Sequence, residues 1–111
     1  MKRRPHDNDD TEDAITGLAT AMVALRSVEQ MCAFLEDLCT PAELEAMNDR
    51  WRVVPLVADG VPYREIHDLT QVSVTTIGRV ARTLDRGAGG YAAALQRRTP
   101  KNPPRPSAPP R

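Results

Sequence analysis

An all-α fold is predicted for this 111-residue chain, and three observations support the prediction. Apolar residues recur at intervals of three and four through several segments, as on the buried side of a helix. Residues that begin and end helices stand between those segments. Residues 62–84 read as two short helices joined by a tight four-residue turn. We expect one helical domain over residues 11–98, preceded by a disordered polar arm at 1–10 and followed by a disordered, proline-rich tail at 99–111.

Two amphipathic helices are expected before residue 40. The first begins near Thr11, and the second begins at Ser27, where Gln30 completes a capping box. Their apolar stripes consist of Ile15, Leu18, Ala19, Met22 and Leu25 in the first helix and of Val28, Met31, Cys32, Leu35 and Leu38 in the second. Stripes of this kind form a core or a dimer interface far more often than a cofactor site. We therefore expect both stripes to be buried.

The two cysteines, Cys32 and Cys39, stand seven residues apart. Two turns along one helix is too far for a disulfide between them, and the spacing is not that of a zinc site. We interpret both as buried thiols in a reducing compartment, and we predict no metal site and no cofactor. No apolar run approaches the roughly eighteen residues of a membrane span, and no signal peptide is recognisable, so a cytoplasmic location is expected.

The third helix has the clearest start signal in the chain. Thr40 supplies a capping hydroxyl, Pro41 suits the first helical position, and Glu43 completes a capping box. The apolar series that follows consists of Leu44, Met47, Trp51, Val54 and Ala58. Gly60 then ends the helix. This spacing is typical of a long helix that packs against other helices.

The two-helix unit at residues 62–84 begins with Pro62, which suits the first helical position. Ser73 is placed to cap the second helix. Each helix has one apolar face, made of Tyr63, Ile66 and Leu69 in the first and of Ile77, Val80, Ala81 and Leu84 in the second. The opposite stripe of the second helix holds no acidic residue and consists of Thr75, Gly78, Arg79 and Arg82. A helix with such a face, braced by a shorter helix across a turn, is typical of major-groove binding to DNA.

Two positions depart from the usual helix-turn-helix pattern. His67 stands where the two helices usually touch through Ala or Gly, and Gln71 stands where the turn usually has Gly. An ordinary helical hairpin therefore remains the alternative for this stretch alone. His67 either contacts a phosphate when protonated or fills the gap between the helices. Gly78, which costs about 1 kcal/mol relative to alanine inside a helix, indicates either close approach of DNA or a tight helix crossing.

The net charge of zero conceals two halves of opposite sign. Residues 1–49 hold 4 Lys and Arg against 11 Asp and Glu, whereas residues 50–111 hold 11 against 4. The two-helix unit lies in the basic half, as a phosphate-binding face requires, although 5 of those 11 cations stand from Arg97 onward. An enzyme is not expected, because the two histidines are far apart and neither an acid pair in a predicted pocket nor a glycine-rich phosphate loop is found.

From residue 37 to residue 97 these features together resemble the Trp repressor family, and look closest to its YerC/YecD branch. The matching features are Thr40-Pro41 with Glu43, Arg50, Gly60, Arg64-Glu65-Ile66, the run Ser73 to Arg79, Asp85-Arg86-Gly87 and Gly89-Gly90-Tyr91. The resemblance covers a little over half the chain. It implies an intertwined, all-helical homodimer whose N-terminal helices interlock with those of the partner copy. It also implies two recognition helices in successive major grooves of double-stranded DNA, about one turn apart.

The same resemblance implies a candidate effector pocket at Thr40, Arg50, Thr76, Arg79 and Val80. In the tryptophan-binding member of the family an indole lies between two arginines, which Arg50 and Arg79 match here. The residue after the second arginine is glycine there, whereas Val80 stands here. Its branched side chain should fill the space of the ligand. We therefore expect a different small molecule, or no effector.

The chain is interpreted as a sequence-specific DNA-binding transcriptional regulator that does not respond to tryptophan. Its candidate DNA-binding residues are Arg64, His67, Ser73, Val74, Thr75, Gly78, Arg79, Arg82 and Arg86. Those expected to reach base edges are Thr75, Gly78 and Arg79, and those expected to position phosphates are Arg64, Ser73, Arg82 and Arg86. The alternative is a helical dimerisation module that binds a protein partner instead of DNA, through the acidic N-terminal half and the proline-rich tail.

Overall fold

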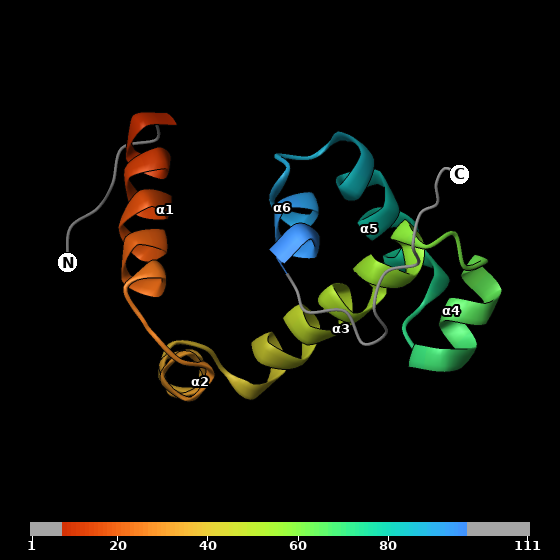
Figure 1. The fold of residues 1–111 in the computed structure, drawn as a ribbon, viewed down its shortest axis with the longest axis horizontal. Coiled ribbons are helices and arrows are strands. Elements are labelled where there is room, and N and C mark those ends of the chain that lie inside the picture. Colours follow the sequence, from red (N-terminus) through yellow and green to blue (C-terminus); the bar gives the residue numbers. More distant parts are fainter. Residues whose placement is uncertain (1–7, 98–111) are drawn as a thin grey trace, which may run out of the picture. The chain divides into compact units, whose positions relative to one another are not determined.

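The computed structural model describes residues 8–97, which form six helices and, within that range, no strand (Figure 1). The helices are α1 Asn8–Val23, α2 Val28–Leu38, α3 Pro41–Ala58, α4 Tyr63–Thr70, α5 Val74–Arg86 and α6 Gly90–Arg97. The predicted all-α class is confirmed. The chain divides into two compact units, residues 1–45 and 46–111, so that α3 begins in the first unit and continues into the second.

Hydrogen bonds at the helix starts agree with the capping signals of the sequence. The Ser27 hydroxyl accepts from the Gln30 backbone N–H at 3.0 Å. At the start of α3 the Thr40 Oγ1 accepts from the Glu43 N–H at 3.1 Å, and the Glu43 carboxylate accepts from the Thr40 N–H at 2.8 Å. Both predicted capping boxes therefore mark real helix starts, whereas α1 begins at Asn8, three residues before its predicted start.

The apolar stripes of α1 and α2 lie open in the single copy described. Among residues 13–45 no side chain is buried, and Ile15 and Val28 are 63% and 80% exposed. Cys32 is exposed and Cys39 is half-buried. The stripes therefore form no core within one copy, and their burial in a dimer interface stays a prediction. Helical periodicity identifies the side of a helix that favours burial, but it does not specify which surface covers that side.

The core of the second unit is small and draws on three helices and one turn. Its buried members are Val53 and Val54 of α3, Ile66 of α4, Val72 of the turn, and Ile77 and Val80 of α5. These positions confirm the predicted buried stripe of α5. Helix α6 adds Tyr91, whose ring lies 6.4 Å from that of Trp51 between centroids. The core thus holds α5 by one side only.

Burial was predicted less well in α3 and α4. Tyr63 and Leu69 remain exposed, Leu69 by 59%, so the apolar face of α4 reduces to Ile66. Val53, which lies outside the predicted series of α3, is fully buried instead of Trp51. An eight-residue helix has about two turns, so only one of its apolar residues faces the core directly.

The turn between α4 and α5 contains no glycine. Pro62 is the N-cap of α4 and not its first helical residue, and α4 ends at Thr70. Gln71 follows with a φ of 66°, in the left-handed region that favours glycine. Its backbone N–H donates to the His67 carbonyl oxygen at 2.7 Å, and its side-chain amide donates to the Asp68 carbonyl oxygen at 3.2 Å. These two bonds offset the cost of the left-handed conformation.

Candidate nucleic-acid interface

Helix α5 presents the residues that the sequence singled out for DNA binding. Ser73 caps it through a hydrogen bond of 3.1 Å from the Thr76 N–H to the Ser73 hydroxyl. Ile77 and Val80 fix one side of the helix in the core. The opposite side is open to solvent at Thr75, Arg79 and Arg82 and partly open at Gly78. The expected division of α5 into a buried and an exposed side is therefore present.

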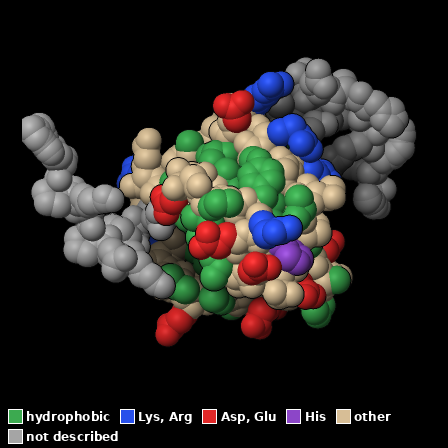
Figure 2. Space-filling view, turned by 90° about the vertical axis from the view of Figure 1, so that its right-hand side faces the viewer, with side chains coloured by type: hydrophobic (Ala, Val, Ile, Leu, Met, Phe, Trp, Pro, Cys, Tyr) green, Lys and Arg blue, Asp and Glu red, His purple; other side chains and the backbone are tan. Residues whose placement is uncertain are grey.

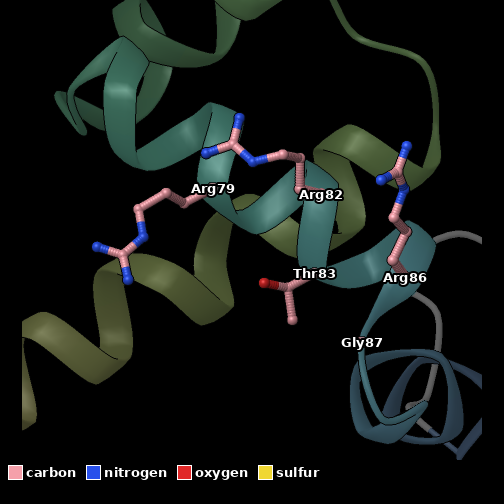
Figure 3. A pocket seen from close by; sticks show the side chains of 5 residues that line it. All are labelled: Arg79, Arg82, Thr83, Arg86 and Gly87. Carbon is pink, nitrogen blue, oxygen red and sulfur yellow. The ribbon is translucent and has the colours of Figure 1, made fainter.

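Three arginines surround a pocket of about 290 Å³ near the C-terminal end of α5 (Figure 3). Its lining consists of Arg79, Arg82, Thr83, Arg86 and Gly87. In Figure 3 the arginine side chains leave the helix in different directions. Gly87 allows the chain to turn closely here, because a Cβ at that position would lie 2.5 Å from the Thr83 carbonyl oxygen. Sequence reasoning did not identify Thr83 or Gly87 as part of this site.

The charge of this pocket is largely uncompensated. Within residues 13–97 neither Arg79 nor Arg82 forms an ion pair. Arg86 lies 3.5 Å from the Asp85 carboxylate, but both side chains are more than three-quarters exposed, so the attraction is weak. In Figure 2 several arginine side chains lie toward the upper right of the face drawn, and a further one lies lower, beside the histidine and close to acidic side chains. Arginines without an ion-pair partner in the described part of the chain, such as Arg79 and Arg82, attract phosphate groups.

Gly78 lies where no other helix crosses. A Cβ built on it would meet one neighbouring atom, the Nη1 of Arg82, at 3.7 Å. The interpretation of Gly78 as a tight helix crossing is therefore wrong for the described residues. Arg82 bends back along α5 toward this position, as Figure 3 shows. The space over Gly78 is open to an incoming surface.

His67 is half-buried in the last turn of α4. Its Nδ1 lies 2.8 Å from the Val72 carbonyl oxygen, so this nitrogen carries the proton and donates. Arg52 of α3 donates from Nη1 to the Thr70 carbonyl oxygen at 3.4 Å and lies 3.7 Å from the Asp49 carboxylate. No sequence signal pointed to Arg52, because the Thr70 carbonyl oxygen that it bonds is eighteen residues away in the sequence.

The remaining candidate DNA-binding residues also reach the surface. Val74 is 52% exposed at the first position of α5, and Arg64 is exposed in the first turn of α4. Ser73 is exposed and lines a second pocket of about 280 Å³. The complete lining of this second pocket is Ala46, Asp49, Arg50, Gln71, Val72, Ser73 and Thr76.

The two pockets described above divide the candidate effector residues between them. Arg50 and Thr76 meet at the second pocket, whereas Arg79 lines the arginine pocket. Val80 is 1% exposed and belongs to the core, as its place on the buried stripe predicted. Thr40 caps α3 in the first unit. That Val80 fills the space of an indole stays a prediction.

Neither a metal site nor a membrane span was found in the described part of the chain. No group of three or more His, Cys, Asp or Glu side chains converges within that part. None of its helices combines the length and the apolar character needed to cross a bilayer.

Comparison with known proteins gives consistent matches. The family model described as Trp repressor protein matches residues 14–99. The chain is 34% identical over 80 residues to the uncharacterized protein YerC of Bacillus subtilis (strain 168), which covers 72% of this chain and 77% of that protein. It is also similar to the crystal structure of a TrpR-like protein from Eubacterium eligens ATCC 27750, with 30% identity and a TM-score of 0.74 over 82% of this chain and 94% of that one.

Proposed function

This chain belongs to the Trp repressor family, and on that premise we propose that it is a sequence-specific DNA-binding regulator of transcription that acts as a homodimer. The observation that carries the proposal is the exposed side of α5, where Arg79 and Arg82 have no ion-pair partner among residues 13–97. The opposite side of the same helix is fixed in the core by Ile77 and Val80. A basic helix that packs against a core on one side and is exposed to solvent on the other suits binding in the major groove of DNA.

Base reading and phosphate binding fall to different positions on this surface. Thr75, Gly78 and Arg79 approach base edges, with Arg79 able to donate two hydrogen bonds to one guanine. The positions that hold phosphates are Arg64, Ser73, Arg82 and Arg86. The protein works in the compartment that holds the DNA, which we take to be the cytoplasm. It does not respond to tryptophan, because Val80 occupies the place that glycine has in the tryptophan-binding member of the family.

Electrophoretic mobility of random and genomic DNA fragments at several salt concentrations tests the proposal. We expect binding that weakens steeply with salt, and a subset of genomic fragments retained at a salt concentration that releases random DNA. A protein that retards no fragment even at low salt would instead favour a helical module for protein partners.

Gly78→Ala is expected to change stability and DNA binding in opposite directions. Alanine should raise the free energy of unfolding by about 1 kcal/mol, because it favours the helix and meets only the movable end of Arg82. The added methyl group should weaken specific DNA binding by about 1 to 3 kcal/mol, the usual cost of extra volume where two surfaces meet closely. Denaturant unfolding and titration of labelled DNA measure the two effects.

Gly17→Ala is the matched control for Gly78→Ala. Gly17 also lies inside a helix, and a Cβ added to it would have no atom within 4 Å, but it belongs to α1 and is not among the residues of the proposed interface. It should give a similar gain in stability and leave DNA affinity unchanged. Unchanged affinity in Gly78→Ala as well would contradict a close approach of DNA at this position.

The open apolar stripe of the first unit supports the homodimer. Ile15 and Leu18 are exposed on α1, and a stripe of this kind is stable in water when another apolar surface covers it. Leu18→Glu is expected to convert a dimer into a monomer, as measured by sedimentation equilibrium. Thr20→Glu, on the other side of α1, should remain dimeric. A wild-type protein that is monomeric at micromolar concentration would contradict the dimer.

A further inference from the structure

The turn that leads into α5 has an unusual feature at Val72. The Val72 N–H donates to the Thr70 hydroxyl at 3.1 Å, and the Val72 carbonyl oxygen accepts from His67 Nδ1 at 2.8 Å. Both side chains belong to α4. The Val72 side chain itself is buried in the core. The buried side chain and the two backbone hydrogen bonds therefore together fix the position of Val72.

The Thr70 hydroxyl both accepts and donates a hydrogen bond. It accepts from Val72 and donates to the Ile66 carbonyl oxygen at 2.7 Å, and the residue is buried. The Thr70 carbonyl oxygen accepts in turn from Arg52. A buried backbone group without a partner is unfavourable, so this network satisfies groups that the non-helical turn would otherwise leave open.

The network lies at the start of α5, next to a first helical residue that is exposed. Only residues 71–73 separate α4 from α5, so the backbone angles of this short segment set the direction of α5. Ile77 anchors α5 one turn further on, but the first residue of the helix, Val74, is more than half exposed. Apolar contacts therefore hold the middle of the helix more firmly than its start. The two hydrogen bonds to Val72 hold the start.

We propose that His67 and Thr70 are positioning residues, which fix the direction of the recognition helix and thereby the sequence specificity of DNA binding. This inference rests on the proposed function and deepens it. His67 acts on DNA through Val72 and not by contact with phosphate. The bond to Val72 persists when the ring is protonated, because Nδ1 donates in the imidazolium as well as in this neutral tautomer.

Paired substitutions at His67 separate positioning from phosphate contact. The side-chain amide nitrogen of asparagine can take the place of Nδ1, so His67→Asn retains a donor for Val72. The amide of glutamine reaches the place of Nε2, so His67→Gln retains a polar group toward solvent and loses the donor for Val72. Positioning predicts that the asparagine variant functions and the glutamine variant does not. A phosphate contact predicts the reverse.

Two substitutions at Thr70 form a second matched pair of variants. Thr70→Ser keeps the hydroxyl, whereas Thr70→Val keeps the shape and leaves the Val72 N–H without an acceptor. The readouts are the ratio of affinities for a selected DNA site and for random DNA, and the hydrogen exchange rate of the Val72 amide. Both are measured on full-length protein at a temperature where circular dichroism shows every variant fully folded, so that a loss of stability alone cannot change the ratio.

We expect His67→Gln and Thr70→Val to lower the specificity ratio by about tenfold, the effect of roughly one net hydrogen bond, and Thr70→Val to speed exchange at Val72 by a similar factor. His67→Asn and Thr70→Ser should stay within about threefold of wild type on the same scale. An unchanged ratio in both disruptive variants, or a loss that is equal for specific and random DNA, would overturn the inference while the proposed function stands.

Failure of the proposed function would give a result that differs from failure of the positioning role. A wild-type protein that binds no DNA removes the regulator and, with it, the claim on specificity, whatever the variants do. Exchange at Val72 is measured without DNA and decides the structural part separately. An unchanged exchange rate in Thr70→Val overturns the positioning role even if DNA binding is as proposed.

Discussion

Replacing Ile77 with alanine is expected to lower the free energy of unfolding by about 2 to 5 kcal/mol. The Ile77 side chain is fully buried and belongs to a core of six buried apolar residues among those that the structure describes. Removing three of its carbon atoms loses apolar burial and leaves a cavity that so small a core cannot easily close. Since small domains are stable by about 5 to 15 kcal/mol, this one change is a large fraction of the total. Urea unfolding followed by circular dichroism measures it.

Val74→Ala is the control on the same helix. Val74 is mostly in solvent, and its truncation should change the free energy of unfolding by no more than about 0.5 kcal/mol. All proteins are compared at one concentration, because the stability of the proposed dimer would depend on concentration. Equal losses in the two variants would show that the core does not hold α5 by the side described here.

Arg79→Ala is expected to weaken binding to a selected DNA site by roughly 1 to 3 kcal/mol and to relax the preference at one base pair. The guanidinium has no carboxylate partner within residues 13–97 and can donate two hydrogen bonds to a guanine. The loss should fall on the correct site and much less on random DNA. Affinities for the selected site and for its single-base variants, measured at one salt concentration, test this expectation.

Arg82→Ala is the variant to compare with Arg79→Ala, because both arginines line the same pocket. Removing a phosphate contact should lower affinity for all sequences and reduce the salt slope by about one. The base preferences should stay those of the wild type. If both arginine variants lost affinity equally for every sequence, Arg79 would be a second phosphate contact and not a base-reading residue.

Helix starts are the part of this fold that local sequence determined. Thr40 and Glu43 bond each other as their spacing predicts, and Ser73 caps α5. These bonds join residues three apart, so the helix itself brings them together once it forms. The buried stripe of α5 followed in the same way from its period. The family resemblance, which depended on these features in order, was confirmed by the match over residues 14–99.

What only the tertiary structure decided is which surfaces and backbone groups meet. Val53 is buried while Leu69 is exposed, although both are apolar and both lie on helices. Arg52 of α3 donates to the Thr70 carbonyl oxygen of α4, eighteen residues away in the sequence. Val80 and Arg50 lie in different surroundings despite their shared place in the predicted effector pocket. Periodicity and capping depend on neighbours along the chain, whereas burial and side-chain partners depend on residues that folding brings together from separate helices.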